Sequence, residues 1–257
     1  MRCRGFTLVE LIIVIILLGI VSTISVRFIT FSTQGAVDTS ARQQRALSGI
    51  VISEQISRAL REALPTSVRS NGDCIEWMPV KAGSNYLNLP RGADPSGFDA
   101  IPLPSGGSET GRVVVYGYSG DVYDPTTPNP GPISPPASMD SSGRVDFDDG
   151  KNHRFTTNSP RKRFFIVDSP KTLCQGGEFL YRYQNYNIEP TIGADLPTSM
   201  PNREVLAANL ASDSLSFDVS PPTLTRGAIV SVRFTLEDPD SEETLDVSQE
   251  VQIRNVP

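Results

Sequence analysis

The sequence predicts an α+β protein in which one long N-terminal helix packs against an antiparallel β-sheet. Three observations predict it: an uncharged apolar run over 11–26, helical spacing of apolar residues over about 38–64, and short β-like runs, broken by Gly, Pro, Asn and Asp, over the remainder. We find no internal repeat and no second helical domain. We therefore expect one β-rich domain, 65–257, after the helix.

The N-terminal segment places a basic stub directly before an apolar stretch of about 20 residues, enough to span a bilayer. An ordinary secretory signal would need a small-residue cleavage site after the apolar run, and 22–25 offer no convincing one. Glu10 is unusual, because an acid inside a membrane segment is costly and normally has a cationic partner. The next basic residue, Arg27, is more than four helical turns away at about 1.5 Å per residue.

The residues from Gly5 to Glu10 resemble the type IV prepilin and pseudopilin family, whose leader ends in Gly followed by Phe-Thr-Leu-x-Glu. The resemblance implies that a prepilin peptidase cuts between Gly5 and Phe6 and that the new Phe6 terminus is N-methylated. It also implies that the Phe6 ammonium of a neighbouring subunit is the missing cation for Glu10. A plain signal anchor, the alternative, leaves Glu10 unexplained.

The same resemblance implies four parts: a leader (1–5), a transmembrane assembly helix (6–26), its amphipathic continuation (27–64) and a periplasmic domain (65–257). We expect a single-pass inner-membrane protein that moves to the pilus or its tip. The expected partners are the prepilin peptidase, other minor and major pilins, and the inner-membrane assembly platform.

The continuation of the helix carries both periodicity and stop signals. Glu54, Arg58 and Glu62 are spaced for weak ion pairs, Gly35 marks a candidate bend, and Pro65 must end or closely follow the helix. The apolar residues recur every three or four positions and share one face: Ile52, Ile56, Ala59, Leu60 and Ala63. That face is expected to pack on a sheet.

Seven runs downstream read as strands: 75–80, 112–118, 163–168, 178–184, 215–219, 229–236 and 247–253. Several alternate apolar and polar residues, which predicts one buried and one solvated face. Between them, 124–136 holds six prolines. Because proline lacks a backbone donor, we expect this segment to be an exposed loop.

The C-terminal half resembles the larger minor pilins, including those of the mannose-sensitive haemagglutinin (MSHA) pilus, and the J-type pseudopilins. The resemblance lies in the runs 163–170, 174–182 and 251–257. Arg27 stands where major pilins usually have a helix-bending proline, which favours a minor pilin that initiates, caps or supports assembly.

Two alternatives stay open, a minor pseudopilin of a type II secretion system and a tip adhesin. An adhesin predicts an exposed pocket with aromatic groups, although strand alternation equally places several tyrosines in the core. The candidates are Tyr116, Tyr118, Tyr123, Tyr181, Tyr183 and Tyr186.

Three cysteines are present, and Cys3 lies in the expected leader. Cys74 and Cys174 are then the only possible pair. In an oxidising compartment we expect a disulfide between them, and two buried free thiols are the alternative.

The remaining composition argues against several other functions. A formal charge of −6 does not suit a nucleic-acid binder, whose affinity comes from neutralising phosphates. His153 is the only histidine, expected in a solvated loop, and common nucleotide-binding, hydrolase and zinc-protease motifs are missing. We expect neither an enzyme nor a cofactor.

Two acidic clusters invite comparison with calcium sites, which use several oxygens from one flexible loop. Neither has the spacing of an EF-hand, and solvated acidic turns are the commoner outcome, so we assign no metal. The clusters are Asp146, Asp148, Asp149 and Asn152, and Glu237, Asp238, Asp240, Glu242 and Glu243.

Overall fold

The structure is a computed structural model that describes residues 7–89, 95–124, 126–239 and 243–254. Its backbone contacts divide the chain into two units, Met1–Ser48 and Gly49–Pro257, which are described separately. Helix α1 (Leu8–Arg61) supplies nearly all of the described part of the first unit and the beginning of the second.

In the first unit, α1 is an uninterrupted helix whose side chains are almost all exposed. It continues through Gly35, so the polar stretch around that residue is helical and does not end the helix. Three hydroxyls donate to backbone carbonyls three or four residues earlier at 2.7–2.9 Å, those of Thr23, Thr30 and Thr39. These bonds satisfy the hydroxyls within the helix, which suits an apolar surrounding.

In the second unit, the apolar face predicted for α1 is confirmed. Ile52, Ile56 and Leu60 are buried, and they share one core cluster with strand residues. Burying each of these side chains contributes roughly 1.5–3 kcal/mol. The helix ends at Arg61, and Pro65 opens the short 3-10 helix η1 (Pro65–Ser67), as the proline predicts.

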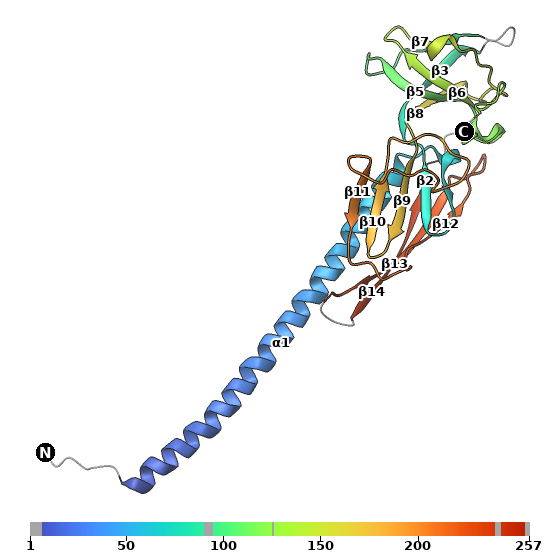
Figure 1. Cartoon of the computed structure of the whole chain (residues 1–257). Coiled ribbons are helices and arrows are strands. Elements are labelled where there is room, and N and C mark those ends of the chain that lie inside the picture. The colour runs from blue at the N-terminus through green and yellow to red at the C-terminus, as the bar shows by residue number, and fades with distance from the viewer. Residues whose placement is uncertain (1–6, 90–94, 125, 240–242, 255–257) are drawn as a thin grey trace. The chain divides into compact units, whose positions relative to one another are not determined.

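Two antiparallel sheets complete this core (Figure 1). The five-stranded sheet has the order β1 (Arg69–Ser70), β2 (Cys74–Trp77), β9 (Lys171–Gly176), β10 (Phe179–Tyr183), β11 (Arg203–Ala207). The three-stranded sheet has the order β12 (Ser216–Ser220), β13 (Ile229–Glu237), β14 (Thr244–Gln252). Apolar side chains of both sheets bury the helix face in one cluster.

The other six strands close into a barrel with the order β3-β4-β7-β6-β5-β8. Their bounds are β3 (Val80–Asn88), β4 (Gly97–Ala100), β5 (Glu109–Val114), β6 (Ile133–Met139), β7 (Arg144–Phe147) and β8 (Arg163–Val167). Two short 3-10 helices, η2 (Gly117–Ser119) and η3 (Asp148–Gly150), lie in the connections. The barrel has its own buried clusters. It is inserted between β2 and β9, two strands that pair directly with each other.

The α+β class is confirmed, and each of the seven predicted strands overlaps an observed one. The expectation of an exposed loop over 124–136 is wrong in part, because β6 begins at Ile133 and its first three residues are buried. The prolines are tolerated because β7 pairs with β6 only from Ala137 onward and the β5–β6 register shifts beside them. Ser134 Oγ accepts the Val113 N–H at 2.9 Å and so completes the ladder at this irregularity.

Candidate functional site

The start of α1 is built around Thr7, the residue before the first helical position. The Glu10 N–H donates to Thr7 Oγ1 at 3.3 Å, and the Leu11 N–H donates to the Thr7 carbonyl at 3.2 Å. Thr7 is therefore the N-cap, and Thr-x-x-Glu has the spacing of a capping box. Glu10 lies in the first turn, where a negative charge favours the helix dipole. Gly5 and Phe6, the expected cleavage site, lie outside the described residues.

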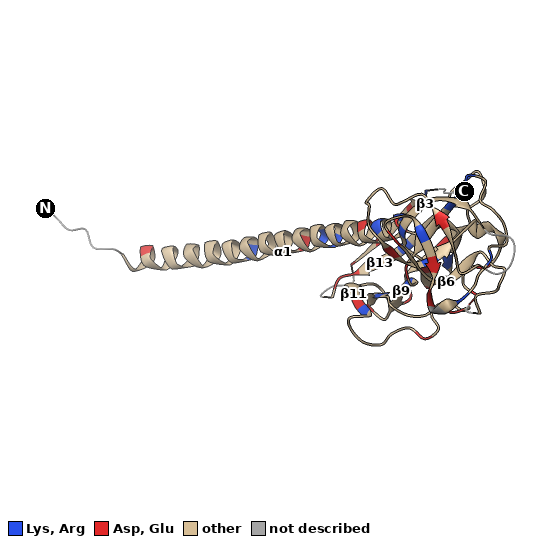
Figure 2. Cartoon of the chain, turned by 90° about the horizontal axis from the view of Figure 1, so that it is seen from above, with Lys and Arg blue, Asp and Glu red and all other residues tan. Residues whose placement is uncertain are grey.

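The stretch that follows is an exposed apolar surface. No charged residue lies between Glu10 and Arg27 (Figure 2). The apolar side chains of this stretch are exposed. Among the described residues, α1 is the one helix long and apolar enough to cross a membrane. Exposure of this much apolar surface is costly in water, so the helix requires lipid or other helices around it.

Comparison with models of known protein families identifies the same segment. Residues 1–26 match the family model described as the prokaryotic N-terminal methylation motif. Searches of curated proteins and of solved structures returned no match. The motif and the apolar helix together support a type IV pilin-like protein, a pilin or pseudopilin that is anchored in a membrane. The motif implies processing by a prepilin peptidase and assembly with other pilins. Proteins of this class are generally structural subunits rather than enzymes.

The expected disulfide is present: Cys74 on β2 is joined to Cys174 on β9. The two residues lie directly opposite each other in the strand register, 100 positions apart in sequence. Because the whole barrel lies between them in the chain, the bond closes the base of the insertion.

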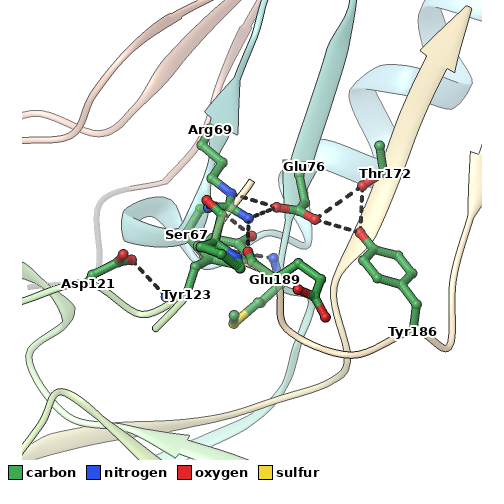
Figure 3. Close-up of polar contacts among 10 residues, drawn as sticks. Ser67, Arg69, Glu76, Asp121, Tyr123, Thr172, Tyr186 and Glu189 are labelled. Carbon is green, nitrogen blue, oxygen red and sulfur yellow. Dashed lines mark hydrogen bonds and ion pairs between the residues drawn. The ribbon is translucent and has the colours of Figure 1, made fainter. Parts of the chain in front are cut away.

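A buried charge near this disulfide was not foreseen from the sequence (Figure 3). The side chain of Glu76 on β2 is 1% exposed, and its Oε2 lies 2.5 Å from the guanidinium of Arg69 on β1. Its Oε1 accepts the Tyr186 hydroxyl at 2.9 Å, and that hydroxyl lies 2.5 Å from Thr172 Oγ1. Glu76 alternates with apolar neighbours along its strand, so its pattern predicted a solvated side chain.

Arg69 extends this cluster to two other segments. Its guanidinium donates to the carbonyls of Glu189 at 2.5 Å and Pro190 at 2.9 Å. It also stacks 3.6 Å from the centre of the Tyr123 ring, and the Tyr123 hydroxyl donates to the Ser67 carbonyl at 2.8 Å. Tyr123 lies between β5 and β6, so one half-buried guanidinium links the five-stranded sheet, the β10–β11 loop and the barrel.

Burial is the main cause of the shifted pKa values in this cluster. It raises the pKa of Tyr123 well above its usual value of 10, and the charge of Glu76 adds to the effect. Burial and the same carboxylate also raise the pKa of Tyr186. Both hydroxyls therefore stay protonated and act as hydrogen-bond donors.

In the structure, several other residues lie in positions that differ from those predicted from the sequence. His153 is buried, with its ring edge-on to Phe147 and Phe155, so the expected solvated position is wrong. The candidate tyrosines do not form one pocket. Tyr123 and Tyr186 join the Glu76 cluster. Tyr181 lies on β10, and the Arg203 guanidinium stacks 3.9 Å from the centre of the Tyr181 ring.

The acidic clusters are also dispersed. Asp146 is bound by Arg144 at 2.8 Å, and Asp148 begins η3. Asp240 and Glu242 of the second cluster lie outside the described residues. Within the described ranges, no group of three or more His, Cys, Asp or Glu side chains is placed to hold a metal ion.

Proposed function

We propose that this chain is a minor type IV pilin of the MSHA type, which enters the inner membrane and helps initiate, cap or support pilus assembly. The observation that carries the proposal is the methylation motif at residues 1–26, continued by an exposed apolar helix with a single acid, Glu10. The resemblance of the C-terminal half to the MSHA biogenesis protein MshO supports the narrower assignment. Arg27, in place of the helix-bending proline of major pilins, supports a minor role.

In this proposal, 1–5 is a leader removed by the prepilin peptidase, 6–26 is the transmembrane assembly helix and 27–64 is its amphipathic continuation. The part 65–257 is periplasmic, where an oxidising environment suits the bond between Cys74 and Cys174. After assembly, the protein resides in the pilus or at its tip.

The assembly step follows from the electrostatics of Glu10. Alone in lipid its carboxylate is disfavoured, by about 2.5–3.5 kcal/mol at the bilayer centre and by less toward the edge where Glu10 would lie. Cleavage after Gly5 would free an N-terminal ammonium on Phe6. Pairing the Phe6 ammonium of one subunit with Glu10 of the next removes both uncompensated charges, so docking is favoured over the isolated state.

The experiment that tests the proposal is crosslinking of the full-length protein in its native membrane, followed by identification of its neighbours. Minor and major pilins and a pilus assembly platform are the expected partners. Recovery of type II secretion components in their place would assign the chain to the pseudopilins and reject the pilus assignment. Recovery of neither set would reject assembly as the function.

A further inference from the structure

A polar cleft with a volume of about 400 Å³ opens on the surface of the barrel. It is lined by Leu89 after β3, by Pro130 from the β5–β6 connection and by all five residues of 154–158 from the β7–β8 connection. The last segment, Arg-Phe-Thr-Thr-Asn, supplies a guanidinium, an aromatic ring, two hydroxyls and an amide. No carboxylate belongs to this lining, so the cleft offers hydrogen-bonding groups without a negative charge.

Backbone hydrogen bonds fix the wall of the cleft. The Gly131 N–H donates to the Arg154 carbonyl at 3.1 Å, and the Thr156 N–H donates to the Gly131 carbonyl at 3.3 Å. The side chains of Thr156, Thr157 and Asn158 are exposed and, within the described ranges, have no hydrogen-bond partner. The backbone therefore holds the wall in place and leaves its two hydroxyls and its amide for a ligand.

A tight turn follows the cleft in sequence and carries three successive cations, Arg161, Lys162 and Arg163, here called the basic turn. The Lys162 N–H donates to the Ser159 carbonyl at 3.0 Å, and the Arg163 N–H donates to Ser159 Oγ at 3.2 Å. From β3, the Tyr86 N–H donates to the Lys162 carbonyl at 2.9 Å. These bonds fix the backbone from which the three cations project, which lowers the entropy cost of binding.

The basic turn borders the cleft. Ser159, where the turn begins, directly follows Asn158 of the cleft wall. Lys162 Nζ donates to the Leu87 carbonyl at 3.4 Å, and Leu87 lies two residues before Leu89 of the cleft. The cleft and the basic turn therefore form one continuous surface.

The cations of the basic turn are not neutralised within the described part of the chain, where none of the three has an ion-pair partner. No acid occurs over 150–167. Asp99, which neighbours the end of β3 opposite Asn88, is already bound by Arg144 at 3.2 Å. Neighbouring like charges repel one another, and an anionic ligand would relieve that repulsion.

The two parts of this surface define the chemistry of the ligand. Hydroxyls and amides form hydrogen bonds with sugar hydroxyls, and an aromatic ring such as Phe155 packs against the apolar face of a sugar. Cations bind carboxylates through strong charge-assisted hydrogen bonds. Duplex nucleic acid fits less well, because a protein of net charge −6 repels a partner with one charge per roughly 1.7 Å.

We propose that the cleft and the basic turn bind an acidic polysaccharide, with sugar hydroxyls toward Thr157 and Asn158 and a carboxylate toward Lys162. The inference goes beyond the proposed function, because a subunit that only supports pilus assembly needs no saccharide site.

The test measures binding of the purified full-length protein, in detergent, to immobilised polygalacturonate, a polysaccharide with one carboxylate on each sugar. We expect binding that weakens as salt is added, and no binding to uncharged dextran. Arg161→Glu with Lys162→Glu should raise the Kd at least about tenfold. The matched control, Arg226→Glu with Arg254→Glu, makes the same change of charge at two exposed positions beside the three-stranded sheet and should leave the Kd unchanged.

Thr157→Val tests the cleft separately from the charges. It should raise the Kd for polygalacturonate about fivefold, through the loss of one hydrogen bond, and leave the weaker binding to poly-L-glutamate unchanged.

Four results would overturn the inference: no binding to polygalacturonate, equal binding to dextran, equal losses in the two double variants, or no effect of Thr157→Val. Tighter binding to poly-L-glutamate or to duplex DNA would also overturn it, in favour of an acidic protein or a nucleic acid. All of these measurements use purified protein, so their failure leaves the proposed function standing, which crosslinking in the native membrane tests by itself.

Discussion

Glu10 lies in the first turn of α1, one turn after Thr7, and two roles follow from that position. It stands three residues after the N-cap Thr7, the spacing of a capping box, and in the proposed function it pairs with the Phe6 ammonium of a neighbour. The two roles respond differently to substitution, because glutamine serves in a capping box almost as well as glutamate but carries no charge.

We predict that Glu10→Ala and Glu10→Gln are both cleaved and inserted in the membrane normally but are both poorly incorporated into the filament complex. The reason is that each leaves the neighbour's ammonium without a counter-charge. Cleaved protein is followed in membranes and in sheared or affinity-purified complexes. If Glu10→Gln assembles like the wild type while Glu10→Ala does not, capping rather than charge pairing is the role of Glu10.

The buried pair of Arg69 and Glu76 makes a second residue-scale prediction. Glu76→Gln should lower the free energy of unfolding of the purified full-length protein by about 3–5 kcal/mol, because it leaves a guanidinium without its carboxylate. The matched control is Glu109→Gln, which removes a partly exposed ion pair whose Glu109 carboxylate lies 2.7 Å from Lys81 Nζ, and it should cost less than about 1 kcal/mol. Equal losses in denaturant titrations of the two variants would show that the Glu76 cluster does not hold the domain together.

The raised pKa values of Tyr123 and Tyr186 predict an alkaline limit to stability. The pKa values of both tyrosines are higher in the folded protein than the value of 10 in the unfolded chain, so both side chains contribute fully to stability below pH 10. As the pH rises through that value the unfolded chain ionises first, and stability falls. Denaturant titrations from about pH 8 to about pH 11 should show this fall. Tyr123→Phe should be less stable at the lower pH, since it loses the bond to Ser67, yet lose less on going to the higher pH. An equal alkaline loss in both proteins would contradict this assignment.

At the scale of elements, the disulfide is the restraint that the sequence predicted and the structure contains. Cys74→Ser with Cys174→Ser should lower the free energy of unfolding by about 2–4 kcal/mol, because the bond limits the unfolded chain over 100 positions. The double variant should also be cleaved faster by protease near the barrel insertion. Mass spectrometry of unreduced peptides checks the bond itself, and two free thiols in periplasmic material would refute it.

Elements with strong local patterns were predictable. The apolar face of α1 and the alternation of Val230, Val232 and Phe234 on β13 both gave the right element and the right buried face. The strand β6 was missed because its prolines forbid a regular strand, and only the pairing with β5 and β7 makes it possible. The strand β3 was missed because Gly83 breaks the pattern. In the structure a Cβ at Gly83 would lie 3.0 Å from the Phe165 ring, so the glycine serves close packing.

The candidate functional residues likewise include some that the sequence could predict and some that it could not. The N-terminal motif was recognisable because its chemistry is contiguous in sequence. The Glu76 cluster was not, because Glu76, Arg69, Thr172, Tyr186 and Tyr123 come from separate segments and meet only after folding.

At the scale of the whole molecule, the class of the protein rests on the first 26 residues, and the rest of the chain gives it its individual features. The described part of the second unit adds a closed barrel between two paired strands, with a disulfide and a buried ion pair at its base. This arrangement lets a large insertion be accommodated without interrupting the pairing of β2 with β9. The processing of the N-terminus therefore decides the class of the protein.

The most direct test of that claim is the N-terminus of the mature protein from membranes, determined by mass spectrometry. The account predicts a chain that begins at N-methylated Phe6. It also predicts that Gly5→Leu keeps the leader attached, because a small residue before the scissile bond lets the peptidase approach. A wild-type protein that begins at Met1, or at a residue beyond the apolar run that ends at Val26, would contradict the account.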